Sequence, residues 1–133
     1  MAEPLNPFRG LVSGRVLTYF DEAFVEWGHG RIRGTYDYAF LAFNSTLYEL
    51  KPGGKTLFEK LAALAADGRI DGRVLELARA SEFLRKHERG ITDMDLSTMS
   101  VADVQELLGF LERLYRSLQD RGVVLANDPR GVH

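Results

Sequence analysis

Residues 56–121 read TLFEK LAALAADGRI DGRVLELARA SEFLRKHERG ITDMDLSTMS VADVQELLGF LERLYRSLQD R, and this stretch decides the fold. It opens with a capping box, Thr56-Leu-Phe-Glu59, in which each side chain satisfies a backbone N–H at the start of a helix. A second segment begins near Asp71 and extends to Gly90, and a third begins at Ser100 and extends to Gly122. Apolar residues recur in all three at the 3.6-residue spacing of an α-helix, so the stretch predicts three helices.

Residues 6–50 predict two further helices. Asn6 before Pro7 is typical of a helix start, and Gly28-His29-Gly30 ends the helical pattern. The next segment carries aromatic and leucine side chains on one stripe as far as Pro52, a residue that stops helices. The sequence therefore predicts an all-α fold, a bundle of about five helices in a single domain over residues 1–133, with frayed ends at 1–5 and 126–133.

One alternative is an α+β fold with an N-terminal β-hairpin. Residues 31–40 alternate apolar and polar positions, and residues 16–20 are rich in β-branched and aromatic side chains, as strands are. Helices are favoured because the helical spacing in the first segment extends over about twenty residues. Strand alternation also breaks at Phe40-Leu41-Ala42-Phe43.

Composition narrows the functional classes. The chain has 133 residues, enough for one domain with a core, and its formal net charge of −2 gives no global field that attracts nucleic acid. It has no cysteine, and its three histidines are widely separated in the sequence, so we expect neither a metal site nor a cofactor. No apolar stretch reaches the length of about 18–20 residues that a membrane helix needs. With no signal peptide visible, the sequence predicts a cytoplasmic protein without membrane contact.

The predicted fourth helix carries the one local concentration of positive charge. Cations near the end of a helix are favoured by its dipole, so the cluster is compatible with a solvated helix face. The same cluster is also compatible with binding of an anion or RNA, because cationic side chains neutralise phosphates. The candidate RNA- or anion-binding residues are Arg73, Arg79, Arg85, Lys86, His87 and Arg89.

Three motifs in residues 56–119 carry a family resemblance: Lys60-Leu-Ala-Ala-Leu-Ala-Ala-Asp-Gly68-Arg-Ile70, Leu75-Glu-Leu-Ala-Arg79 and Leu84-Arg-Lys-His87. With the leucine-rich final helix, they resemble the HEPN superfamily, in particular its uncharacterised bacterial and mannitol-operon-repressor-like branches. The resemblance implies a helical bundle that often dimerises. Some members of that superfamily are metal-independent ribonucleases, and others are regulators or interaction partners.

By position, Arg79 and His87 match the arginine and histidine of that family. The resemblance implies that in a ribonuclease His87 would act as general base or acid and Arg79 would stabilise the charged transition state. Phe83 stands where the family usually has asparagine. On one continuous helix, Arg79 and His87 would lie about 12 Å apart along the axis and about 80° apart around it. Joint action on one phosphate therefore requires a helix break or a two-fold dimer.

Two functions follow as predictions. The first is a small non-enzymatic regulatory or interaction module that binds a protein partner through a helix face, with a homodimer as one form. The second is an HEPN-like RNA-binding or RNA-cleaving domain that uses the basic cluster. They differ in salt dependence, because RNA binding weakens steeply as salt rises, whereas an apolar protein contact does not.

Overall fold

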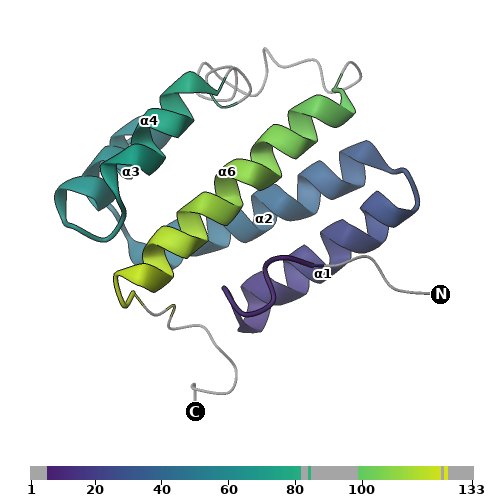
Figure 1. The fold of residues 1–133 in the computed structure, drawn as a ribbon, viewed down its shortest axis with the longest axis horizontal. Coiled ribbons are helices and arrows are strands. Elements are labelled where there is room, and N and C mark those ends of the chain that lie inside the picture. Colours follow the sequence, from purple (N-terminus) through teal and green to yellow (C-terminus); the bar gives the residue numbers. More distant parts are fainter. Residues whose placement is uncertain (1–5, 82–83, 85–98, 124, 126–133) are drawn as a thin grey trace. The chain divides into compact units, whose positions relative to one another are not determined.

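The computed structural model describes residues 6–81, 84, 99–123 and 125, and within them the chain forms five helices and no strand (Figure 1). The helices are α1 (Gly14–Gly28), α2 (Ile32–Leu50), α3 (Leu57–Ala66), α4 (Gly72–Ala80) and α6 (Val101–Asp120). The predicted all-α class is confirmed. The alternative with an N-terminal β-hairpin is wrong, because residues 32–40 belong to α2 and residues 16–20 to α1.

The chain divides into two compact units, the first built on α1 and α2 and the second on α3, α4 and α6. In the first unit α1 and α2 pack side by side (Figure 1). Gly30, with φ of +73°, makes the turn between them, and the Arg31 guanidinium donates to Glu26 Oε2 at 2.9 Å. Ala39 and Ala42 are fully buried on α2, because small side chains let neighbouring helices approach closely.

The first helix begins at Gly14, so the start predicted at Asn6 and Pro7 is wrong. Asn6 closes a short turn instead, because its side-chain oxygen accepts the Phe8 N–H at 2.9 Å. Gly10 then adopts a φ of +90°, which a right-handed helix does not allow. The segment between Asn6 and Gly14 places the Phe8 ring on the Phe20 ring of α1, with centroids 3.7 Å apart.

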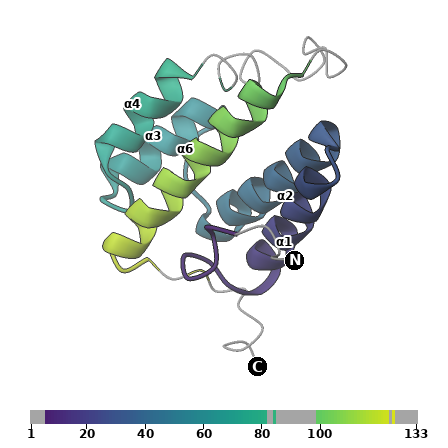
Figure 2. The same ribbon diagram turned by 45° about the vertical axis from the view of Figure 1, so that its right-hand side comes forward.

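In the second unit α3 and α4 lie side by side, and α4 also packs on α6, as Figures 1 and 2 both show. The predicted cap of α3 is confirmed, since Thr56 Oγ1 accepts the Glu59 N–H at 3.1 Å. The Glu59 carboxylate accepts the N–H of Lys55, one residue before the position that a standard capping box uses. Gly68, with φ of +76°, ends the turn after α3.

The fourth helix ends at Ala80, ten residues before the predicted end at Gly90. Ser81 has an extended backbone, with φ of −77° and ψ of 117°. Its hydroxyl accepts the N–H of Leu84 at 3.1 Å and donates to Glu106 Oε1 at 2.6 Å. A serine hydroxyl that bonds a nearby backbone N–H competes with the helical pattern, which explains why the helix stops here.

The last helix, α6, begins as predicted. Ser100 and Asp103 form a complete capping box, in which each side chain accepts the backbone N–H of the other residue. After Asp120, Gly122 adopts a φ of +73° and the Val123 N–H donates to the Leu118 carbonyl at 2.9 Å, the pattern of a glycine-terminated helix. Among the described residues, no helix is long and apolar enough to cross a membrane.

Burial of Tyr36 on α2 gives one pH-dependent prediction. The side chain is 3% exposed, and burial first and the Asp37 carboxylate second raise the pKa of Tyr36 from 10.0 to about 12. The neutral phenol is therefore favoured in the folded chain. The contribution of the neutral phenol to the free energy of unfolding is fully present below pH 10 and is lost as the pH rises through 12. The stability lost at still higher pH is on the order of a few kcal/mol.

An absorbance titration of phenolate formation measures this shift. In the folded protein we expect a tyrosine step near pH 12 that Tyr36→Phe removes. If Tyr36→Phe leaves the high-pH part of the curve unchanged, the assignment to Tyr36 is wrong.

Candidate functional site

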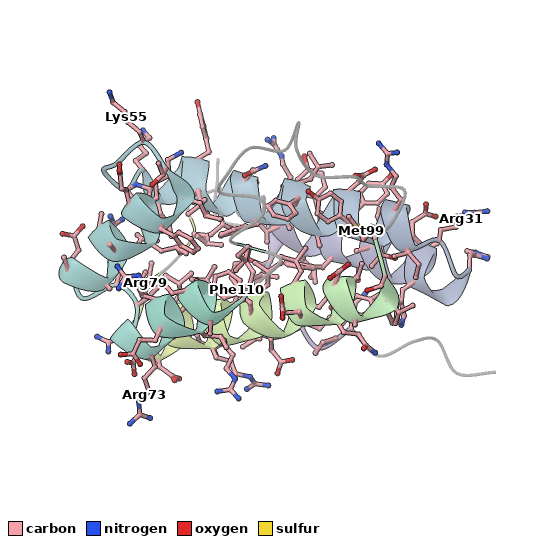
Figure 3. All side chains as sticks on the ribbon, turned by 90° about the horizontal axis from the view of Figure 1, so that it is seen from above. Arg31, Lys55, Arg73, Arg79, Met99 and Phe110 are labelled. Carbon is pink, nitrogen blue, oxygen red and sulfur yellow. The ribbon has the colours of Figure 1, made fainter. Side chains whose placement is uncertain are left out.

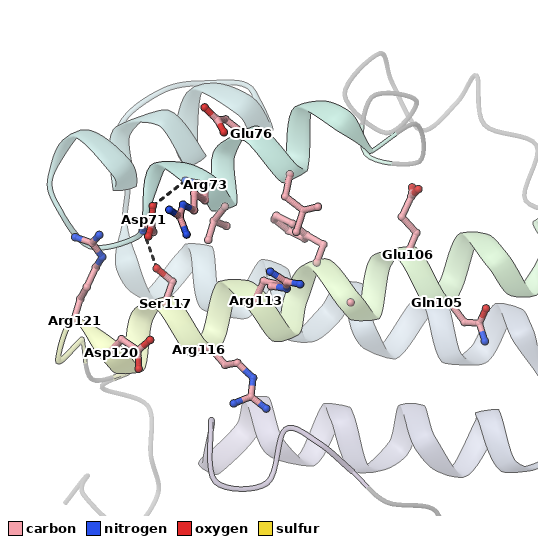
Figure 4. Close-up of a pocket in the computed structure, with 14 residues that line it drawn as sticks. Asp71, Arg73, Glu76, Gln105, Glu106, Arg113, Arg116, Ser117, Asp120 and Arg121 are labelled. Atoms are coloured by element: carbon pink, nitrogen blue, oxygen red, sulfur yellow. Dashed lines mark hydrogen bonds between the residues drawn. The ribbon is translucent and has the colours of Figure 1, made fainter.

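Two hydrogen bonds fix α4 antiparallel to α6. At the start of α4, the Asp71 N–H donates to the Ser117 hydroxyl at 2.7 Å (Figure 4). At its end, the Ser81 hydroxyl donates to Glu106 Oε1 at 2.6 Å. The start of α4 is thus bonded near the end of α6, and the end of α4 is bonded near the start of α6. Residues 71–81 therefore run along residues 106–117 in the opposite direction.

An open groove of about 990 Å³ lies between these two helices. It extends from Gln105 in α6 to Arg121, the residue directly after α6, a distance of about 24 Å at the helical rise. Its apolar part is formed by Val74 and Leu77 from α4 and by Gly109 and Phe110 from α6. Leu77 is 38% exposed although it is apolar, so the groove presents hydrophobic surface to solvent.

At Gly109 the α6 wall of the groove has no side chain. It lies inside α6, and a Cβ atom built on it would meet no atom within 4 Å. Glycine in a helix interior destabilises it by about 1 kcal/mol relative to alanine. No close packing within the described residues explains why this position is glycine. The space where its side chain would lie is therefore open to a group from another molecule.

The groove carries charges of both signs. Four arginines line it, namely Arg73, Arg113, Arg116 and Arg121, and so do four carboxylates, Asp71, Glu76, Glu106 and Asp120. Arg116 donates to Glu112 at 3.0 Å, and Arg121 donates to the Gly68 carbonyl at 3.2 Å. In the part of the chain that the structure describes, the guanidinium groups of Arg73 and Arg113 have no ion-pair partner, so both can bind a carboxylate or a phosphate.

The structure places two of the predicted site residues, and it does not bring them together in one groove. Arg73 lines the groove, whereas Arg79 is exposed in the last turn of α4 and is not part of its lining. Six residues apart on one helix, they lie about 120° apart around the axis. Their side chains leave α4 in different directions (Figure 3). Outside the described residues lie Arg85, Lys86, His87 and Arg89.

Sequence reasoning missed Arg113, Arg116 and Gly109. A signal existed, because these residues recur at helical spacing on the polar side of α6, opposite its leucines. The stripe could be identified as polar, but only the pairing with α4 makes it one wall of a groove. No group of three or more potential metal ligands lies together among the described residues. The groove thus offers apolar contact and charge-assisted hydrogen bonds as its means of recognition.

Comparison with known proteins gives no family for this chain: it matches no family model, no curated protein and no solved structure. The HEPN resemblance of residues 56–119 therefore stays a prediction.

Proposed function

We propose that this protein is a small non-enzymatic regulatory or interaction module that binds a protein partner through the helix face formed by α4 and α6. The observation that carries the proposal is the groove, with exposed Leu77 on its α4 wall and Gly109, which has no side chain, on its α6 wall. The proposal keeps the cytoplasmic location that the sequence predicts.

The composition of the groove favours a protein partner over a small molecule. Protein interfaces combine an apolar centre with a polar rim and are enriched in arginine, and this groove has both features. Small-molecule sites enclose most of their ligand, whereas this groove is open to solvent. Its length of about 24 Å would accommodate about four turns of a helix.

Filling the groove at Gly109 tests the proposal. Gly109→Trp adds a large ring to the α6 wall of the groove, at a position where the Cβ atom would meet no atom within 4 Å. Gly53→Trp is the matched control, because a Cβ atom on Gly53 would also meet nothing within 4 Å and Gly53 lies outside the groove. We expect Gly109→Trp to reduce the amount of partner retained from extract of the native host by at least about tenfold, since the ring removes central contacts. Gly53→Trp should retain the wild-type amount.

Two outcomes would count against this function. One is equal retention by Gly109→Trp and Gly53→Trp, with both variants showing wild-type helicity by circular dichroism. The other is a retained fraction that disappears after ribonuclease treatment, which would indicate RNA as the bound molecule. Quantitative mass spectrometry of the retained proteins and a parallel ribonuclease-treated sample separate these cases.

A second candidate is the HEPN-like RNA-binding or RNA-cleaving domain, and one observation favours it. Because α4 ends at Ala80, Arg79 and His87 do not share one continuous helix. The separation that one helix would impose on them therefore does not apply, and joint action on one phosphate is compatible with the end of α4. The ribonuclease-treated sample above distinguishes this candidate from a protein partner. Its binding would also weaken steeply between low and physiological salt and would depend on Arg79 and His87.

A further inference from the structure

We propose that the groove binds a second copy of this chain, with the two α6 helices packed antiparallel across Gly109. The inference rests on the proposed function, because it names the partner of the same face. In such a dimer a two-fold axis relates the copies, so each contact between them occurs twice.

The exposed face of α6 has opposite charges on the two sides of Gly109. Glu106 lies three residues before Gly109 and Arg113 lies four residues after it, and both side chains are exposed. Residues at these spacings lie on one face of a helix. A two-fold axis beside Gly109 therefore places Glu106 of each copy opposite Arg113 of the other, which forms two ion pairs.

The same pattern disfavours other arrangements. In a parallel pair, Glu106 would face Glu106 and Arg113 would face Arg113, so like charges would repel. A uniformly acidic occupant would meet Glu76 and Glu106, and a uniformly basic one would meet Arg73 and Arg113. The four arginines and four carboxylates of the groove are compatible with a self-complementary surface.

Gly109 also suits the crossing point of two helices. Helix axes pack about 8–10 Å apart depending on the side chains at the contact, and glycine permits the shortest distance. Leu77 and Phe110 line the groove together with Gly109, so close approach of a second helix would bury the exposed part of Leu77. The hydrophobic contribution then lies at the centre and the two ion pairs lie on either side of it.

Sedimentation equilibrium on the full chain tests the inference with charge reversals. We expect the wild-type protein to dimerise as its concentration rises. Arg113→Glu alone and Glu106→Arg alone should each raise the dimer Kd by at least about tenfold, because each turns two attractive contacts into repulsive ones. An equimolar mixture of the two variants should recover the wild-type Kd. In the mixed dimer the introduced arginine faces the introduced glutamate, and native Arg113 faces native Glu106.

Circular dichroism controls for folding, because Glu106 also accepts the Ser81 hydroxyl. If Glu106→Arg fails to fold, Arg113→Glu compared with Arg113→Gln replaces the mixture, and the glutamate variant should dimerise more weakly than the glutamine variant. A monomeric wild-type chain at all concentrations, or a wild-type Kd in the charge-reversal variants, overturns the inference. So does a mixture of folded variants that fails to recover dimerisation. Where Gly109-dependent capture of a different protein persists beside a monomeric chain, the proposed function stands and only the second copy is wrong.

Discussion

Replacing Phe8 by alanine should lower the free energy of unfolding by about 3–5 kcal/mol, the usual effect of removing a buried aromatic ring. Phe8 is fully buried although it precedes the first helix. Its ring stacks on Phe20 with an angle of 6° between the planes, and its centroid lies 6.2 Å from that of Phe24. Loss of this ring leaves a cavity beside α1, which the remaining side chains fill only in part.

Arg9→Ala is the matched control for Phe8→Ala. Arg9 is adjacent in sequence, and its exposed guanidinium donates to Asp21 at 3.1 Å. An exposed ion pair contributes at most about 1 kcal/mol to the free energy of unfolding, so we expect Arg9→Ala to shift the unfolding midpoint only slightly. Denaturant unfolding followed by circular dichroism compares the two variants. Equal midpoints would contradict the packing of residues 6–13 on α1.

Gly54→Ala should destabilise the protein by about 2–4 kcal/mol, from backbone strain together with a steric clash. Gly54 has a φ of +102°, a backbone conformation that residues other than glycine rarely adopt. A Cβ atom there would lie 2.7 Å from Glu59 Cβ and 3.0 Å from the Glu59 carbonyl carbon. The carbonyl carbon belongs to the backbone of α3, so the contact is relieved only by moving the helix start.

Gly53→Ala provides the control one residue earlier. Its Cβ atom would meet nothing within 4 Å, and its φ lies outside the left-handed region. We expect a change within about 0.5 kcal/mol, as for ordinary surface substitutions. Thermal unfolding of both variants measures the difference. A Gly54→Ala midpoint equal to that of Gly53→Ala would show that the turn before α3 tolerates a side chain.

Local signals in the sequence were sufficient for most helices. The apolar spacing predicted α2 and α6, and the caps at Thr56 and Ser100 predicted two helix starts correctly. The predicted start of the first helix was wrong because Asn6 accepts the Phe8 N–H in a turn. The Phe8 ring packs on Phe20, a residue twelve positions later. Helix starts and turns use the same residues, so local sequence does not separate them.

The candidate site depended on contacts that the sequence does not show. The end of α4 at Ala80 follows from Ser81, whose hydroxyl bonds Glu106, a residue 25 positions later. The predicted cluster grouped Arg73 with Arg79 because they are close in sequence, but helical geometry separates them. The groove requires α4 and α6 to be antiparallel, and this pairing is a tertiary property that helical periodicity does not encode.

Site-specific photo-crosslinking tests the central claim, that the groove between α4 and α6 is the binding face. A photoreactive amino acid replaces Leu77 in the groove or, as a control, Tyr48 on α2, which is 80% exposed. After irradiation with extract of the native host, we predict a protein adduct from position 77 and none from position 48. The adduct has twice the mass of the chain if the partner is a second copy. Adducts of equal yield from both positions, or none from position 77, would contradict the claim.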